Sequence, residues 1–190
     1  MGAATARGLS VVQLSRSQTG FLMNSFASSL AAAAALSLAV VAVPAEAALG
    51  PDAAACNSGS GRPALLVSVS GFKLRGGRVR VQVYDSSNFL VKGQRVARVD
   101  LPVTGPVMPV CVALPRGGSY AVAVRHDVNG NNKSGDWSDG GGFSRNPKIS
   151  FFHLKPSFGE VAVPVGNAPR PVSVVLNYRQ GLTIGPVASR

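Results

Sequence analysis

Apolar residues recur at every second position along most of this chain, in runs too short for amphipathic helices. The clearest run is Arg78 to Asp85, in which Val79, Val81 and Val83 alternate with polar or basic side chains. Because successive side chains of a β-strand point to opposite faces, this alternation predicts a half-buried strand with a basic outer face. The period of two disfavours a helical body.

Seven further short apolar runs have the same character, and Gly, Pro, Asn or Ser bound each of them. They are Ala64 to Phe72, Val96 to Val103, Val107 to Leu114, Tyr120 to His126, Ile149 to His153, Glu160 to Val165 and Val172 to Tyr178. We therefore predict an all-β fold, an antiparallel β-sandwich of seven to eight strands over residues 64–181, immunoglobulin-like or transthyretin-like, with a C-terminal tail at 182–190.

The N-terminal region has the pattern of a secretory signal peptide. Residues Phe26 to Val43 carry no charge, and the small residues Ala45 and Ala47 follow them. This order predicts a signal peptide over residues 1–47 and a periplasmic or secreted protein, with Met23 as an alternative start. A membrane anchor is the other interpretation, but no Lys or Arg follows the run to stop transfer. We expect no transmembrane segment in the mature chain.

Two cysteines, Cys56 and Cys111, lie in the predicted mature chain. In an oxidising compartment such a pair most simply forms one disulfide. The strand alternation directs Cys111 away from the core, so the leader segment 48–63, which contains Cys56, is expected to be clamped across the outside of a sheet. The alternative is lipidation of Cys56, although a lipid-bearing cysteine normally adjoins the apolar run.

The charge of the chain is sparse and one-sided. The sequence has 19 Lys and Arg against 8 Asp and Glu, a net charge of +11. Without Arg7, Arg16 and Glu46 the predicted mature chain has 17 basic and 7 acidic residues, or +10. An anionic envelope component or polysaccharide suits such a domain as a partner. Aromatic residues are only 6% of the chain, which argues against nucleic acid. The alternative is that the charge serves solubility alone.

One loop has oxygen-bearing side chains at alternate positions. The segment after Arg125 contains six candidate ligands for a cation: Asp127, Asn129, Asn131, the carbonyl of Lys133, Asp136 and Asp139. This spacing is used by loops that wrap a hard cation, so we predict a weak Ca²⁺ site. The twelfth position is Ser138, where an EF-hand has a bidentate Glu, and the sixth is Asn132, where an EF-hand has Gly. The alternative is a surface loop built from Asx-turns.

Four segments resemble one bacterial secreted family: SGFKLRGGRVRVQVYD, YAVAVRHDVNGNNK, WSDGGGFSRNPK and VVLNYRQG. The family is catalogued as domain of unknown function 2141, here in a variant with paired cysteines. The resemblance covers about Cys56 to Gly181 and implies a secreted or periplasmic β-sandwich with no established activity. The motif positions are matched by His126, Asp127, Asn129, Asn131, Asp139, Gly142 and Phe143, while Asn132 and Gly135 depart from the pattern.

The sequence contains no recognisable set of catalytic residues, so we expect that the protein is not an enzyme. The leading hypothesis is a non-enzymatic envelope binding or structural module whose loop from Asp127 to Phe143 forms a recognition surface. Trp137, the only tryptophan, is either a packing lid or an exposed ligand anchor. The alternative hypothesis is a small hydrolase or accessory catalytic domain that uses His126 with a nearby carboxylate.

Overall fold

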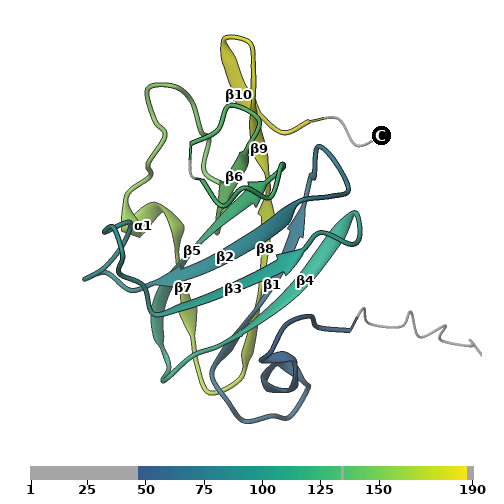
Figure 1. Ribbon diagram of the computed structural model, residues 1–190. Helices are drawn as coiled ribbons and strands as arrows, with labels where there is room; N and C mark the ends of the chain where they lie inside the picture. The colour runs from purple at the N-terminus through teal and green to yellow at the C-terminus, as the bar shows by residue number, and fades with distance from the viewer. Residues whose placement is uncertain (1–46, 134, 188–190) are drawn as a thin grey trace, which may run out of the picture. The chain divides into compact units, whose positions relative to one another are not determined.

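The computed structural model describes residues 47–133 and 135–187, which form two packed β-sheets (Figure 1). Residues 1–46, and with them nearly all of the predicted signal peptide, lie outside the described residues. Within the described ranges no helix is long and apolar enough to cross a membrane.

Ten strands and two short helical turns make up the domain. The strands are β1 Ala64–Ser70, β2 Arg78–Tyr84, β3 Ala97–Pro102, β4 Val107–Ala113, β5 Gly118–Asp127, β6 Gly140–Phe143, β7 Ala162–Val165, β8 Pro169–Val175, β9 Asn177–Gln180 and β10 Thr183–Gly185. The helical turns are η1 Ala53–Cys56 and α1 Phe158–Val161. The predicted all-β sandwich is confirmed, with more strands than the seven or eight expected.

The smaller sheet has three strands in the order β4-β1-β8. β1 pairs antiparallel with β4 but parallel with β8, so the sandwich is not wholly antiparallel as predicted. The strand order in the larger sheet is β10-β9-β6-β5-β2-β3. β7 also pairs with β5, through β5 residues 118–121, whereas β6 pairs with β5 residues 123–126.

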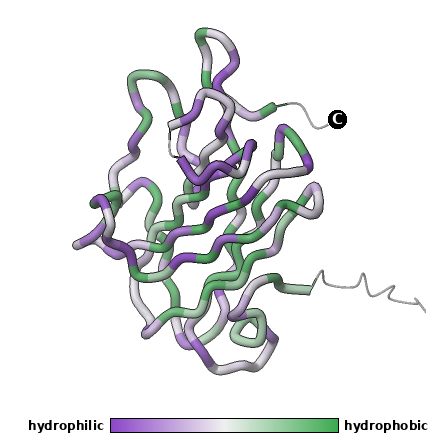
Figure 2. The backbone as a smooth tube through the Cα atoms, viewed as in Figure 1, coloured by the Kyte–Doolittle hydropathy of each residue, from purple (hydrophilic) through white to green (hydrophobic). Residues whose placement is uncertain are grey.

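The core lies between the sheets and is built mainly of valine. Alternation works as predicted in β2, where Val79, Val81 and Val83 are fully buried and the intervening Arg80 and Gln82 are not. Figure 2 shows the same alternation of apolar and polar residues along the strands. Burial of this β-branched face is the main favourable term in folding of the sandwich.

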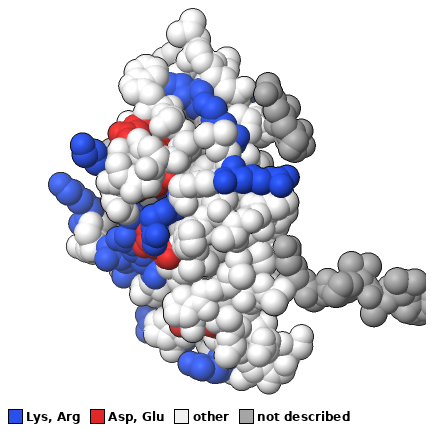
Figure 3. Space-filling model, turned by 45° about the vertical axis from the view of Figure 1, so that its right-hand side comes forward, with Lys and Arg blue, Asp and Glu red and all other residues white. Residues whose placement is uncertain are grey.

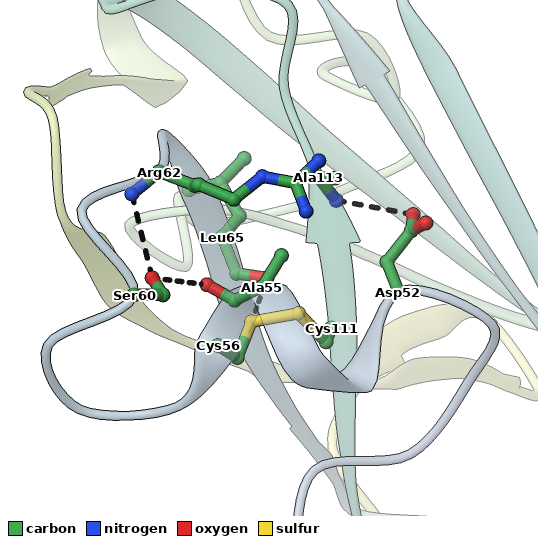
Figure 4. Close-up of a disulfide and its surroundings, with 8 residues drawn as sticks. All are labelled: Asp52, Ala55, Cys56, Ser60, Arg62, Leu65, Cys111 and Ala113. Atoms are coloured by element: carbon green, nitrogen blue, oxygen red, sulfur yellow. Dashed lines mark hydrogen bonds between the residues drawn. A yellow bond between two sulfur atoms is a disulfide. The ribbon is translucent and has the colours of Figure 1, made fainter.

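The leader segment lies along the β4 edge of the small sheet and against its outer face. Leu49 pairs with β4 through two main-chain hydrogen bonds, to Pro109 and Cys111, and Asp52 accepts a hydrogen bond from the Ala113 amide. Cys56 forms a disulfide with Cys111 (Figure 4). Cys111 does point away from the main core, as predicted, and it is buried in a second small cluster with Ala55 and Ala64.

Three of the runs predicted as strands do not form single strands in the structure. Ile149 to His153 forms only an isolated bridge between Ser150 and His153. The run from Glu160 begins in helix α1, because the Glu160 carboxylate accepts hydrogen bonds from Ser157 and caps a turn there. The run from Val172 to Tyr178 divides at Leu176 into β8 and β9, which belong to different sheets.

Two strands lie where no run was predicted. β6 is Gly140–Phe143, and β10 lies inside the segment 182–190 that was predicted as a tail. Neither has the alternation of large apolar residues on which the prediction depended.

Candidate functional site at the loop end of the domain

The loop of residues 128–139 joins β5 to β6 and folds back over the polar face of the large sheet (Figure 1). Two arginines of that face hold it. Arg125 donates to the Lys133 carbonyl at 3.0 Å, and Arg80 donates to the Asn132 side-chain oxygen at 3.3 Å. The loop therefore rests on the sheet through charge-assisted hydrogen bonds.

Asx-turns give the loop its internal shape. The Asn129 side-chain oxygen accepts from the Asn131 amide at 3.1 Å, and the Asn131 side-chain oxygen accepts from the Lys133 amide at 2.7 Å. The side-chain nitrogens of both asparagines donate to Asp136 Oδ2, at 3.1 and 2.6 Å. These two bonds hold the pKa of Asp136 below its usual range. Three predicted ligands thus lie together, joined by hydrogen bonds to one another.

Asp127 and Asp139 are placed differently from these three. Asp127 is only 2% exposed, and its Oδ2 accepts from Arg125 at 3.3 Å and from the Asn132 amide at 2.8 Å. Asp139 Oδ1 accepts from the Val128 amide at 3.3 Å. The other oxygens, Asp127 Oδ1 and Asp139 Oδ2, are buried without a hydrogen-bond partner. Burial, with a contribution from the Asp127 charge, raises the pKa of Asp139.

The oxygens free to bind a cation are therefore fewer than the six predicted. The Asn129, Asn131 and Lys133 oxygens accept protein hydrogen bonds, and within the described residues no group of three or more His, Cys, Asp and Glu side chains is arranged to hold a metal. Carboxylate oxygens such as Asp127 Oδ1 and Asp139 Oδ2 are the type of ligand that a hard cation binds. Unlike the exposed oxygens of the loop, these two are buried and accept no hydrogen bond from the described residues.

Asn132 departs from the pattern of the loop, and its backbone conformation explains how the loop accommodates it. Asn132 has φ +62°, in the left-handed region where Gly is the usual residue. Asparagine tolerates that region better than other non-glycine residues. The loop can therefore keep its turn although Gly is replaced at this position.

A hollow of about 270 Å³ opens beside the loop. Its lining includes Asp136, Trp137 and Asp139 of the loop, Leu154, and Asn177 and Arg179 of β9. Trp137 is 75% exposed, so it is not a packing lid over the core. Its ring lies 3.8 Å from the Arg179 guanidinium carbon, a cation–π contact. Sequence reasoning missed Arg179, because β9 carried no sign that it would lie beside this loop.

His126 lies inside the sandwich. It is 0% exposed, its Nδ1 is 2.6 Å from Tyr178 Oη, and its Nε2 is 2.7 Å from the Gly76 carbonyl. The rings of Phe72 and Tyr178 pack edge-on against the imidazole. A general base must reach substrate, and this imidazole has both nitrogens engaged in the interior. The geometry gives the hydrolase hypothesis no support.

The polar face of the large sheet carries a mixed network of charges. β3 pairs beside β2, and this places Asp100 opposite Arg80. Asp100 accepts from Arg80 Nε at 2.6 Å and also from Arg98. Burial favours the neutral acid, but the two arginines outweigh burial and lower the pKa of Asp100. Figure 3 shows basic groups gathered on this side of the molecule with acidic atoms between them.

A larger hollow of about 560 Å³ lies at the opposite end of β2 and β5. Its polar groups bond to one another: the Asp85 carboxylate accepts from the amide and hydroxyl of Ser87, and Tyr120 donates to the Arg116 carbonyl. The loop end, which has an exposed tryptophan beside its hollow, is the better candidate site.

Comparisons with known proteins point to one family. No curated protein and no solved structure matches the chain. A family model matches residues 67–173, which span β1 to β8 and include the whole loop between β5 and β6. The chain therefore belongs to the bacterial family described as "Uncharacterized protein conserved in bacteria (DUF2141)".

Proposed function

We propose that this protein is an exported, non-enzymatic binding module of the bacterial envelope, and that the loop end of the sandwich is its recognition surface. The observation that carries the proposal is the exposed Trp137, held by Arg179 at the edge of the 270 Å³ hollow. Exposed aromatic residues beside a concave, partly polar surface are common in binding sites.

Export is supported by the chemistry of the cysteines and by the N-terminal sequence. A disulfide such as Cys56–Cys111 forms and persists in an oxidising compartment outside the cytoplasm. The signal-peptide pattern before residue 48 agrees with that compartment.

A single Ca²⁺ bound between Asp127 and Asp139 is the second part of the proposal. Two buried carboxylate oxygens without partners are costly, and a hard cation would satisfy both. Two carboxylates supply little negative charge, so the affinity is expected in the range of about 10⁻⁴ to 10⁻³ M. The bound ion would fix the start of the loop to its end.

Co-sedimentation with the envelope fraction of the source organism tests the binding function. The processed protein with its disulfide intact is expected to sediment with the envelope, and Trp137→Ala is expected to lower the bound fraction. Val91→Ala, an exposed apolar residue in another loop, is the matched control. Absence of the wild-type protein from the pellet would overturn the proposal.

Calorimetry with Ca²⁺ and with a chelator tests the cation. Calcium at millimolar concentration should raise the melting temperature of the wild type but not of Asp139→Asn, whereas Asp85→Asn should respond as the wild type does. Superimposable melts of the wild type in calcium and chelator would remove the ion and leave the binding function intact.

A further inference from the structure

Large exposed apolar side chains gather at the loop end. Five of the eight such residues among the described positions lie in the β5–β6 loop, the β6–α1 segment and the β9–β10 turn: Trp137, Phe151, Phe152, Leu154 and Leu182. We call these five the aromatic tip. Phe152 is 102% exposed and Leu182 is 93% exposed. Single exposed apolar residues are normal, but a cluster marks an interaction surface.

Arg179 joins the aromatic tip into one surface. Its guanidinium carbon lies 3.8 Å from the ring centroid of Trp137 and 5.3 Å from that of Phe151. Leu182 follows three residues later, in the turn between β9 and β10. Leu154 and Trp137 line the same hollow. Three segments far apart in sequence therefore contribute to one apolar surface.

The two most exposed side chains extend from separate projections of this surface. Phe152 belongs to the segment between β6 and α1, and Leu182 belongs to the β9–β10 turn; both segments project from the same end of the sandwich (Figure 1). A small ligand held in the hollow would leave these outer side chains in water. A broad apolar medium approached end-on can bury both together.

Basic side chains accompany the aromatic tip. Lys148 and Lys155 are exposed on the segment that carries Phe151 and Phe152, and the Arg179 guanidinium carbon lies 5.3 Å from the Phe151 ring centroid. No salt bridge among the described residues involves Lys148, Lys155 or Arg179. Asp136 Oδ2 accepts from two asparagines, and Glu160 Oε1 lies 3.2 Å from His153. The cations are therefore available to an anionic partner, and the mature charge of +10 adds long-range attraction.

We propose that the aromatic tip docks on the surface of an anionic phospholipid bilayer. Phe152 and Leu182 enter the boundary between headgroups and acyl chains, and Lys148, Lys155 and Arg179 bind lipid phosphates. Aromatic and aliphatic side chains with neighbouring lysine and arginine are the composition that binds at this boundary. This inference rests on the proposed envelope-binding function and names its partner.

Vesicle co-sedimentation tests the inference. The processed protein is mixed with vesicles of phosphatidylcholine alone or of equal parts phosphatidylcholine and phosphatidylglycerol. Binding is expected to the anionic vesicles and to weaken as salt rises. The double variant Phe152→Ala/Leu182→Ala should bind at least about tenfold more weakly, since two apolar side chains no longer leave water. Lys148→Glu/Lys155→Glu should also lose binding, whereas Val91→Ala and Lys92→Glu should not. All of these positions are exposed, so the variants should fold.

The outcomes distinguish docking on lipid from the proposed envelope-binding function on which it rests. Equal binding of the wild type and Phe152→Ala/Leu182→Ala to anionic vesicles would overturn the docking geometry. Failure to bind vesicles, together with binding to lipid-extracted envelope, would overturn the lipid partner but support an envelope module that binds polysaccharide or protein. Failure to bind either preparation would overturn both proposals.

Discussion

The imidazole of His126 and the phenol of Tyr178 are hydrogen-bonded in the interior of the sandwich, with 2.6 Å between Nδ1 and Oη. The Lys73 amide donates to the same phenol oxygen at 3.1 Å, so the phenol proton is free to donate to Nδ1. The imidazole then carries its proton on Nε2 and donates to the Gly76 carbonyl. This network connects β5, β9 and the β1–β2 connection, and burial favours the neutral form of the histidine within it.

Stability should therefore decrease in mildly acidic solution. Burial lowers the pKa of His126 below its usual value of 6.5, although the Gly76 carbonyl and the charges of Asp139 and Asp127 oppose burial. Because the unfolded chain binds the proton more readily, the stabilisation is complete above about pH 6.5 and is lost as the pH falls toward the folded pKa, by at most about 1.4 kcal/mol per pH unit. Urea unfolding between pH 7.5 and 5 measures this slope.

An NMR titration of the two histidines provides the control for this prediction. His153→Gln should keep the pH dependence, because His153 is exposed. A His126 ring that titrates at or above pH 6.5 in the folded protein would contradict the prediction.

Removal of the Tyr178 hydroxyl should destabilise the domain. Tyr178→Phe leaves the Lys73 amide and His126 Nδ1 without their partner, and each buried polar group left unsatisfied costs about 1–3 kcal/mol. A loss of about 2–4 kcal/mol is expected from chemical denaturation. Tyr120→Phe is the matched control, since it removes a single bond to the Arg116 carbonyl and should cost about 1 kcal/mol. Equal losses in the two variants would rule out the network as a special source of stability.

The same hydroxyl should resist ionisation. Burial raises the pKa of Tyr178 to about 12, opposed by the Lys73 amide and assisted by the charge of Asp139. Spectrophotometric titration should therefore find at least one tyrosine that ionises only at strongly alkaline pH. If all three tyrosines ionised near pH 10 while the protein remained folded, Tyr178 would not be buried as described.

Strand faces could be predicted from the sequence wherever large side chains alternate. Val79, Val81 and Val83 were placed in the core correctly, and so was the outward direction of Cys111. β6 could not be predicted, because its residues Gly140 to Gly142 carry no side chains from which a face can be inferred. Leu176 directly follows Val174 and Val175, yet there the chain crosses from one sheet to the other, and only tertiary pairing specifies that crossing.

The candidate site could be predicted in part. The spacing of Asp127, Asn129 and Asn131 identified a structured loop, and the asparagines do lie beside Asp136. The sequence could not show that Arg80 of the neighbouring strand would donate to Asn132, which is 52 residues away. Long-range pairing also brings Arg179 onto Trp137 and so creates the hollow.

Reduction of the disulfide should lower stability substantially. Cys56 and Cys111 are separated by 55 positions, and closing a loop of that length restricts the unfolded chain by about 4 kcal/mol. The melting temperature should fall when a reductant is added, because the leader then relies on its few hydrogen bonds to β4. Cys56→Ala/Cys111→Ala should show the lower melting temperature in both conditions. A wild type indifferent to reductant would mean that the covalent link contributes little.

The three consecutive glycines of β6 should differ in their tolerance of a side chain. An added Cβ at Gly142 would lie 2.7 Å from the Val175 carbonyl oxygen, and one at Gly140 would lie 2.4 Å from the Tyr178 ring. At Gly141, by contrast, the nearest atom would be the Val124 carbonyl oxygen at 3.6 Å, an ordinary contact. Because backbone and a buried aromatic ring cannot easily move, Gly142→Ala and Gly140→Ala should each cost about 1–3 kcal/mol or more. Gly141→Ala should be neutral, or stabilising by about 0.5 kcal/mol through reduced entropy of the unfolded chain. Chemical denaturation of the three variants measures the contrast, and a Gly141→Ala loss as large as that of its neighbours would contradict the packing of β6 against β9.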